Sequence, residues 1–305
     1  MIKEKVVITG GSGLVGNQLK KIFQKGIFLS SKDFNLTKET EVVSMYESLK
    51  PDIIVHLAAR VGGILDNINR PAEYFLDNVK MNTLLVEYAH KYNVKKFIGV
   101  LSSCIYPDTA EKYPLLEEDL HSGPPTQTNF SYGYAKRALA VQIDAFNKQY
   151  KTNYQYLIPC NLYGENDKDN EAHSHFVTAL IKKIKTAVIN GDKHITLFGD
   201  GTPLRQFIHA LDFAKIIYFI LKGNIQGNYN VCGEENLSIK EIAEIALKAC
   251  DAQHLEIKWD TSKPNGQYRK DMSQEKLKKA LPFFKYTSLY QGIKDTYNFN
   301  YGKIG

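Results

Sequence analysis

Short apolar runs alternate with longer amphipathic stretches over the first half of the chain. The runs are rich in β-branched and aromatic residues, which is typical of buried parallel strands, and they lie at residues 5–9, 27–30, 53–59, 97–101 and 154–159. Between them, apolar positions recur at helical spacing, for example through Leu19, Ile22 and Phe23, at residues 71–92 and around Tyr132. This rhythm predicts right-handed crossovers, with ligands at the carboxyl ends of the strands. The predicted fold class is α/β, a Rossmann-type doubly wound parallel sheet.

The pattern becomes more varied in the second half of the chain. A polar loop at residues 165–170 is followed by a predicted helix over residues 175–184. Residues 195–201 are typical of a strand that ends in a turn. Arg205 then precedes an apolar strand and a helix that begins near Leu211. These elements predict a second, smaller unit.

Length and composition allow two units of unequal size. The chain has 305 residues, of which 43% are hydrophobic, so it can bury a sizeable core. We predict a main domain over residues 1–164 and a smaller C-terminal α/β substrate lobe over residues 165–305. Some of the chain between residues 190 and 235 is expected to return to the main domain.

The charge balance points to a small anionic ligand. The formal net charge is +6, and no dense block of Lys and Arg is interleaved with aromatic residues. This argues against a nucleic-acid partner. A mildly basic protein suits an anionic substrate or cofactor, because positive clefts attract such ligands.

The cysteines and the apolar runs indicate the cellular compartment of the protein. The cysteines are widely spread and form no Cys-x-x-Cys pair; they are Cys104, Cys160, Cys232 and Cys250. This spread argues against a disulfide framework or a structural zinc site and favours a reducing compartment. The start of the chain lacks a signal-peptide core, and no apolar run is long enough to span a bilayer. We therefore expect a cytoplasmic protein without a membrane partner.

A glycine-rich run follows the first predicted strand and opens the first predicted helix. Its glycines permit a tight turn and let backbone N–H groups approach a pyrophosphate, which then faces the helix N-terminus. A strand before it and a helix after it are the context that a dinucleotide-binding turn needs. The candidate cofactor-binding residues here are Gly10, Ser12, Gly13, Leu14, Val15 and Gly16.

The end of the second predicted strand bears on the choice of dinucleotide. Enzymes that prefer NAD normally carry an acidic residue here for the ribose 2′-hydroxyl. This chain instead offers Ser31 and Lys32, a hydroxyl and a cation that suit a 2′-phosphate. Asp33 lies one step further along and keeps NAD open as an alternative. We predict NADP.

The third predicted strand ends in small residues. Leu57, Ala58 and Ala59 would let a cofactor pass close to the backbone, and we count them as cofactor-binding. His56 comes just before them and is expected to be structural rather than catalytic.

Candidate catalytic residues lie between two of the predicted elements. Ser102 comes directly after an apolar strand and could hydrogen bond a substrate oxygen. Tyr132 and Lys136 are four residues apart, so on a helix they share one face. A nearby ammonium is expected to lower the pKa of the phenol, as suits an acid/base catalyst. The alternative is a polar helix surface, because this short spacing is common.

Several motifs together resemble one family. The glycine-rich turn, Ser102 and the Tyr132/Lys136 pair are similar to those of the extended short-chain dehydrogenase/reductase superfamily. Residues 56–63, 102–107, 161–164, 201–207 and 260–270 narrow the resemblance to the GDP-L-fucose synthase family, whose members are GDP-4-keto-6-deoxymannose 3,5-epimerase-4-reductases. Cys104, two residues after Ser102, separates this family from most of its relatives. The resemblance covers residues 5 to about 295.

The resemblance implies catalytic roles. Tyr132 would donate a proton to the C4 oxygen of the sugar as NADPH delivers hydride to C4, with Ser102 orienting the carbonyl. Lys136 would bind the nicotinamide ribose and tune Tyr132. Cys104 and His175 match the family's acid/base pair for inversion at C3 and C5. The hydrogens on carbons that flank a ketone are acidic, so a thiolate and an imidazole can exchange them before reduction.

The same resemblance implies binding residues. For the cofactor these add Lys136, Pro159, Asn161, Leu162 and His175, and for the substrate Ser103 and Asn161. Arg205 matches a family position on the nucleotide diphosphate, with Lys183 and Arg269 as further candidates. The other lysines, including Lys276, Lys278 and Lys279, are expected to be surface charges.

Two departures from the family pattern leave the sugar open. The family usually has Gly-Pro-His-Asp-Asn-Phe where residues 164–169 read GENDKD, and a proline where this chain has Thr178. A GDP-4-keto-heptose 4-reductase of surface polysaccharide biosynthesis, without epimerase activity, is therefore an alternative. A non-catalytic NADP-binding protein is a second, although the Tyr/Lys pair argues against it. The family also implies a homodimer.

Overall fold

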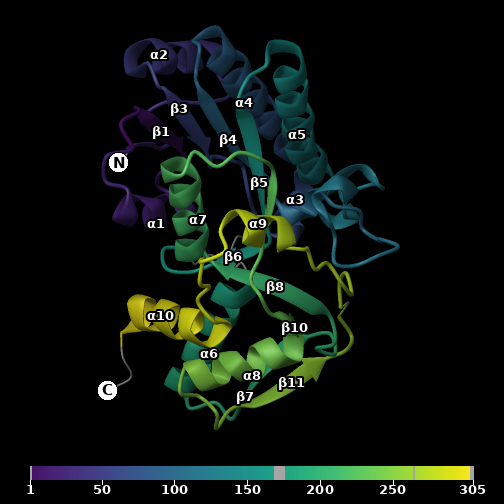
Figure 1. Cartoon of the computed structure of the whole chain (residues 1–305). Coiled ribbons are helices and arrows are strands. Elements are labelled where there is room, and N and C mark those ends of the chain that lie inside the picture. Colours follow the sequence, from purple (N-terminus) through teal and green to yellow (C-terminus); the bar gives the residue numbers. More distant parts are fainter. Residues whose placement is uncertain (1, 168–175, 264, 303–305) are drawn as a thin grey trace.

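The computed structural model describes residues 2–167, 176–263 and 265–302 of the chain. A six-stranded sheet in the order β2-β1-β3-β4-β5-β9 forms the centre of the upper unit in Figure 1. All neighbouring strands in it pair in parallel. The strands are β1 (Val6–Thr9), β2 (Ile27–Leu29), β3 (Ile53–His56), β4 (Lys96–Val100), β5 (Tyr154–Pro159) and β9 (Tyr229–Val231). The predicted Rossmann-type sheet is confirmed.

The third strand is shorter than predicted. We expected it to continue to Ala59, but β3 ends at His56. The reason is that the chain turns across the end of β1: the N–H of Leu57 donates to Thr9 O at 3.2 Å, and that of Ala58 donates to the Thr9 hydroxyl at 3.4 Å. Leu57, Ala58 and Ala59 therefore form a loop at the edge where ligands bind in such sheets.

Helices cover both faces of this sheet, as Figure 1 shows. On one face α1 (Leu14–Ile22) packs against α7 (Ala210–Lys222). On the other face α4 (Pro71–Lys91) packs against both α2 (Glu39–Leu49) and α5 (Phe130–Tyr150). The short helix α3 (Ile64–Asn69) precedes α4. The 3₁₀ turns are η1 (Ser103–Ile105), η2 (Glu117–His121) and η3 (Gln127–Asn129).

A second unit lies below the first in Figure 1. Its three-stranded sheet has the order β10-β8-β6, and a separate parallel pair joins β7 to β11. The strands are β6 (Asn161–Tyr163), β7 (His194–Phe198), β8 (Leu204–His209), β10 (Asn236–Ser238) and β11 (Glu256–Asp260). Its helices are α6 (Phe176–Asn190), α8 (Ile239–Ala249) and α10 (Leu289–Tyr301). Each unit has its own cluster of buried apolar side chains.

The chain crosses between the two units more than once. Within the segment expected to return, β7 and β8 belong to the sheets of the lower unit, whereas α7 and β9 belong to the upper one. Later, α9 (Glu275–Ala280) packs against β9. Because of these crossings, the division at residues 164 and 165 stays a prediction. Helix α6 continues to Asn190, beyond the predicted end at Ile184.

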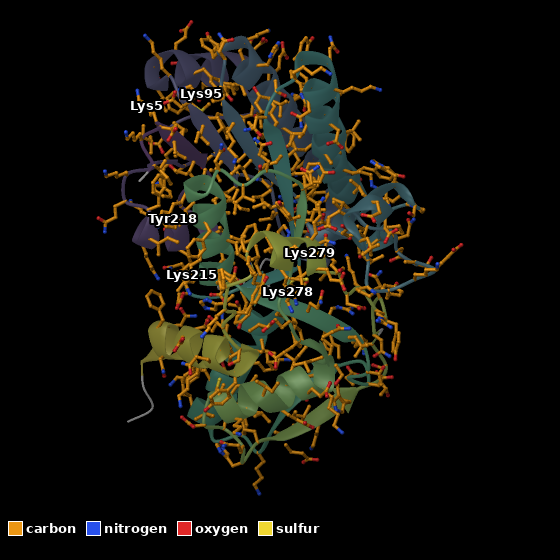
Figure 2. All side chains as sticks on the ribbon, viewed as in Figure 1. Lys5, Lys95, Lys215, Tyr218, Lys278 and Lys279 are labelled. Carbon is orange, nitrogen blue, oxygen red and sulfur yellow. The ribbon has the colours of Figure 1, made fainter. Side chains whose placement is uncertain are left out.

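The lysines that we expected at the surface lie on α9. Figure 2 labels Lys278 and Lys279 there. Lys278 pairs with Glu234 at 3.2 Å, and the Lys276 ammonium lies 5.6 Å from the centre of the Tyr229 ring. In the part of the chain that the structure describes, no helix combines the length and the apolar character that crossing a lipid bilayer would require.

Candidate active site at the carboxyl ends of β1, β3 and β4

The turn between β1 and α1 has the close packing that a dinucleotide site needs. Gly10 has φ +72°, and a Cβ there would lie 2.7 Å from the backbone nitrogen of Ala58. A Cβ on Gly16 would lie 2.5 Å from Gly10 O, so only glycine brings the helix this close to the turn. Gly13 precedes α1 without a side-chain cap, and the first turn of α1 holds no acidic residue. The helix dipole and uncapped N–H groups therefore suit a pyrophosphate.

The turn after β2 favours a 2′-phosphate over a 2′-hydroxyl. The Asp33 carboxylate accepts hydrogen bonds from the Ser30 N–H at 2.7 Å and the Ser30 hydroxyl at 2.8 Å. These bonds lower the pKa of Asp33 and turn its carboxylate back on its own loop. Ser31 and Lys32 are exposed beside it. Asp33 is thus engaged within the turn, while a hydroxyl and a cation remain accessible.

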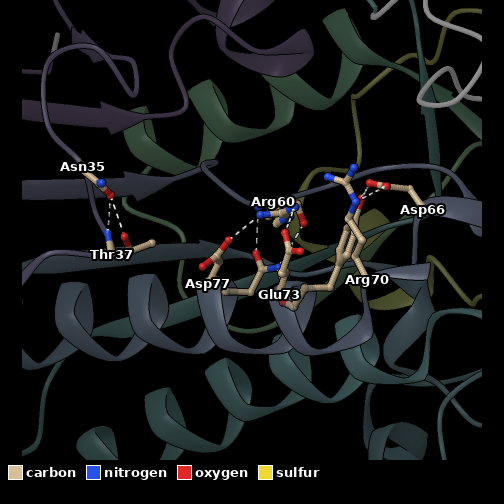
Figure 3. A network of polar contacts seen from close by, with 9 residues as sticks. Asn35, Thr37, Arg60, Asp66, Arg70, Glu73 and Asp77 are labelled. Atoms are coloured by element: carbon tan, nitrogen blue, oxygen red, sulfur yellow. Dashed lines mark hydrogen bonds and ion pairs between the residues drawn. The ribbon is translucent and has the colours of Figure 1, made fainter. Parts of the chain in front are cut away.

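The loop after β3 is anchored on α4, as Figure 3 shows. The Arg60 guanidinium forms ion pairs with Glu73 and, at 2.8 Å, with Asp77. The backbone N–H of Arg60 donates to the Asn78 side-chain oxygen at 3.0 Å, and the Asn78 amide donates back to Arg60 O. The guanidinium also lies over the Tyr74 ring, with 5.4 Å to its centre. These contacts fix the loop that contains Ala58 and Ala59.

His56 has a structural role, as predicted. Its Nδ1 accepts from the Thr9 hydroxyl at 2.8 Å, and its Nε2 donates to the Asn82 side chain at 3.0 Å. The Asn82 amide in turn donates to Ala135 O in α5 at 3.2 Å. Burial lowers the pKa of His56 to about 3, so the ring is neutral at physiological pH. This bridge ties α5 to β1 and β3.

Ser102 and Cys104 lie on the turn that follows β4. The Ser102 hydroxyl accepts from the N–H of Cys104 at 3.3 Å and so caps η1. Ser103 is buried, whereas Cys104 is partly exposed. The Sγ of Cys104 accepts a hydrogen bond from the Asn129 amide at 2.7 Å. Sequence reasoning missed Asn129, although it lies only three residues before Tyr132.

Tyr132 and Lys136 are both buried in α5, next to this turn. The Lys136 ammonium donates to Val100 O at the end of β4, at 2.8 Å, and burial lowers the Lys136 pKa to about 8. The Tyr132 pKa is raised, first by burial and then by the charge of Cys104, with a hydrogen bond from Ser102 opposing. The expected lowering of the Tyr132 pKa was therefore wrong. Removal from water is the largest cause, because it disfavours the charged phenolate, while the Lys136 ammonium is directed to Val100 O.

The remaining predicted cofactor residues lie where β5 leads into β6. Pro159 pairs with Val231 of β9, and Leu162 pairs with Ile208 of β8. The Asn161 side chain donates to Gln206 O at 2.9 Å. His175 lies outside the described residues.

The structure brings two of the three predicted substrate cations close together. Leu204 N donates to Tyr268 O at 2.8 Å, which places the neighbouring residues Arg205 and Arg269 on adjacent segments. Burial lowers the pKa of Arg205, while the Arg269 guanidinium pairs with Asp271 at 3.0 Å. Lys183 instead donates to Thr196 O in β7 at 2.6 Å.

Two residues at which the chain departs from the family pattern, Glu165 and Thr178, make specific contacts. The Glu165 carboxylate accepts from the buried Gln18 side chain of α1 at 2.6 Å and lies 3.9 Å from Nε2 of His209. The Thr178 hydroxyl donates to Asp167 at 2.6 Å. Glu165 thus joins the segment after β6 to the cofactor helix, and its contacts are with protein groups of both units.

Comparisons with known proteins agree with this geometry. Residues 6–232 match the model of the NAD dependent epimerase/dehydratase family. The chain is 36% identical to GDP-L-fucose synthase from Dictyostelium discoideum, over 96% of this chain and 94% of that protein.

Two solved structures are informative. A GDP-L-fucose synthetase from Naegleria fowleri bound to NADP superposes with a TM-score of 0.89 at 33% identity, over 98% of this chain and 93% of that one. A GDP-mannoheptose C4 reductase from Campylobacter jejuni with NADP bound gives a TM-score of 0.85 at 25% identity, over 98% and 99% of the two chains.

Proposed function

This chain belongs to the NAD dependent epimerase/dehydratase family, and we propose that it reduces the C4 keto group of a GDP-4-keto-sugar with NADPH and epimerises C3 and C5, as in GDP-L-fucose synthesis. One observation carries the proposal. Ser102, Cys104, Tyr132 and Lys136 meet at the carboxyl end of β4, in the sheet whose β1 leads into the glycine turn. The chain is an NADP-dependent oxidoreductase.

Bound NADPH would supply the hydride for C4. The glycine turn and the start of α1 would hold its pyrophosphate, and Ser31 and Lys32 its 2′-phosphate. Tyr132 donates its proton to the C4 oxygen, and its raised pKa keeps it protonated until the oxygen becomes basic. Ser102 hydrogen bonds the same oxygen and orients the carbonyl. The Lys136 ammonium binds the ribose and stabilises the phenolate that remains.

Epimerisation would precede reduction, because it needs the ketone. A thiolate at Cys104 removes a proton from the carbon next to the carbonyl, and the electron pair moves onto the C4 oxygen. By the family resemblance, His175, which lies outside the described residues, would return a proton. Ser102 and Tyr132 stabilise the developing oxyanion through hydrogen bonds. Arg205 and Arg269 hold the diphosphate, because Arg binds phosphate oxygens in a fork.

The sugar is the part on which the relatives differ. One structural relative is a GDP-mannoheptose C4 reductase, so a heptose is the second candidate. A panel of GDP-4-keto sugars in D₂O, supplied with NADPH, separates the two. The proposed function requires deuterium at C3 and C5 of a 6-deoxyhexose product. Reduction of a heptose without label at either carbon would favour the alternative.

The Tyr132→Phe variant tests the reductase itself. We expect kcat for NADPH oxidation to fall by about a thousand-fold, since a positioned general acid typically contributes ~10²–10⁴. The Kd for NADPH, measured by fluorescence titration, should stay within about two-fold, because the residues that we propose for its phosphates are unchanged. Wild-type turnover by this variant would refute the assignment of Tyr132.

We further propose a homodimer in the cytoplasm. Exposed apolar or small residues form a stripe along α5 (Tyr134, Ala138, Val141 and Ala145), and Phe75 and Leu76 are exposed on the neighbouring α4. A two-helix face of this kind can pair with its own copy about a two-fold axis. Four free thiols suit a reducing compartment.

A further inference from the structure

The side chain that faces the Cys104 thiol belongs to the start of α5. Asn129 ends η3 and occupies the N-cap position of α5. Asparagine at this position normally caps a helix with its side-chain oxygen. Here it makes no side-chain cap. Its amide donates to Cys104 Sγ at 2.7 Å instead.

No competing hydrogen bond holds the Asn129 amide elsewhere among the described residues. Its Oδ1 is buried and has no hydrogen-bond partner among the described residues. A buried amide oxygen without a partner costs free energy, which a helix cap would have avoided. The contact with sulfur is therefore the polar interaction that the side chain makes, and it is a donor contact.

Two further contacts fix the turn that carries the thiol. A Cβ on Gly133 would lie 2.8 Å from Cys104 O, so α5 approaches this turn more closely than any other residue would permit. The Arg137 guanidinium is buried and donates to Ile105 O at 3.1 Å and to Gly123 O at 2.9 Å. One helix thus holds the thiol, its donor and Tyr132 in a single rigid arrangement.

We propose that Asn129 is a positioning residue for epimerisation, which holds the Cys104 sulfur towards the sugar and stabilises it as the thiolate. This rests on the proposed function. An amide donor favours the charged acceptor, and a thiolate accepts a stronger hydrogen bond than a thiol. When the thiolate takes a proton from carbon, the C–H bond breaks, an S–H bond forms and the electron pair moves to the C4 oxygen.

The same turn also affects Tyr132. Burial is the largest cause of the raised Tyr132 pKa, and a negative charge on Cys104 raises it further. While the thiol is ionised, the phenol therefore keeps the proton that reduction needs later.

Alkylation measures the thiolate directly and needs no substrate. Cys160, Cys232 and Cys250 are buried, so iodoacetamide should modify Cys104 selectively, and mass spectrometry can follow the rate from pH 6 to 10. In Asn129→Ala we expect the rate at pH 7 to fall about ten-fold and the midpoint to rise by about one pH unit. Asn129→Asp keeps the size of the side chain but places a carboxylate against the sulfur. The midpoint of the alkylation profile should therefore rise further than in Asn129→Ala.

Gln127→Ala is the matched control, because Gln127 is an exposed residue of the same turn, η3. Its alkylation profile should follow the wild type. An unchanged or faster rate in Asn129→Ala would overturn the proposal. So would an equal slowing in Gln127→Ala, which would indicate a loosened turn.

Solvent exchange tests the consequence for the reaction. With substrate in D₂O, Asn129→Ala should slow label entry at C3 and C5 about ten-fold more than it slows NADPH oxidation with an already epimerised ketone. Equal slowing of both reactions would overturn the role in epimerisation. If the wild type incorporates no label while the alkylation profiles behave as expected, the proposed epimerase activity fails and the contact with the thiol stands.

Discussion

At the scale of single residues, the site depends on how burial redistributes charge. Tyr132 and Lys136 are both desolvated, so the pKa of the phenol rises and that of the ammonium falls to about 8. This leaves Tyr132 protonated and ready to act as an acid. At the exposed end of β2 the opposite holds. There Asp33 is engaged by Ser30, and the Lys32 side chain is exposed beside it, where it can reach a phosphate.

Lys32→Ala tests the preference for NADPH. Loss of one charge-assisted contact with the 2′-phosphate should raise KM for NADPH about ten-fold and leave KM for NADH within about two-fold. Lys25→Ala is the control, since Lys25 is exposed near the other end of β2. Initial rates with both cofactors give the comparison. A parallel rise in KM for NADH would contradict a specific phosphate contact.

At the scale of elements, buried polar bridges place α5 on the sheet. Thr9, His56, Asn82 and Ala135 connect β1, β3, α4 and α5 in sequence. Both ring nitrogens of His56 are occupied, so its position determines how the catalytic helix meets the strand ends. A protonated ring would lose its acceptor at Nδ1.

His56 should make stability depend on pH. Its pKa is about 3 when folded and near 6.5 when unfolded, so the stability from keeping the ring neutral is present above pH 6.5 and is lost as pH falls towards 3. At pH 5 the free energy of unfolding should be about 2 kcal/mol lower than at pH 7.5 from this group alone. Urea denaturation of the wild type and of His56→Gln measures it. The variant should lack this part of the decline; equal slopes would show that other groups cause it.

At the scale of the whole molecule, the chain crosses between the two units more than once. The chain leaves the main sheet after β5, builds β6, β7 and β8, and returns through α7 and β9. Glu165 adds a polar link between the lower segment and α1. Helices α4 and α5, which carry the face that we propose for the dimer, belong to the upper unit (Figure 1).

Val141→Glu tests the dimer. Val141 is 50% exposed on α5, and a carboxylate buried without a partner in the interface should weaken association at least ~100-fold. Sedimentation velocity should then show monomer at micromolar concentration. Ile189→Glu, at a residue of α6 that is 69% exposed, should leave the dimer intact. Dissociation in both variants, or in neither, would count against this face.

The sequence by itself determined the features whose physics is local. Apolar runs and helical spacing specified the strands and helices, since burial on both faces of a parallel sheet needs uninterrupted apolar residues. The glycine turn could be predicted from the sequence, because only glycine tolerates its positive φ and its close backbone contacts. The end of β3 could not be predicted from the sequence, because hydrogen bonds from Leu57 and Ala58 to Thr9 determine where the strand ends.

Only the tertiary structure decided the features that depend on residues distant in sequence. These features include the hydrogen bonds from Lys136 to Val100 O, from Asn129 to the Cys104 sulfur and from Gln18 to Glu165. Desolvation depends on everything packed around a group, so the sign of the Tyr132 pKa shift could not follow from a four-residue spacing. The residue types and their spacing indicated the chemistry of this protein, whereas long-range packing determined the charge state of each group.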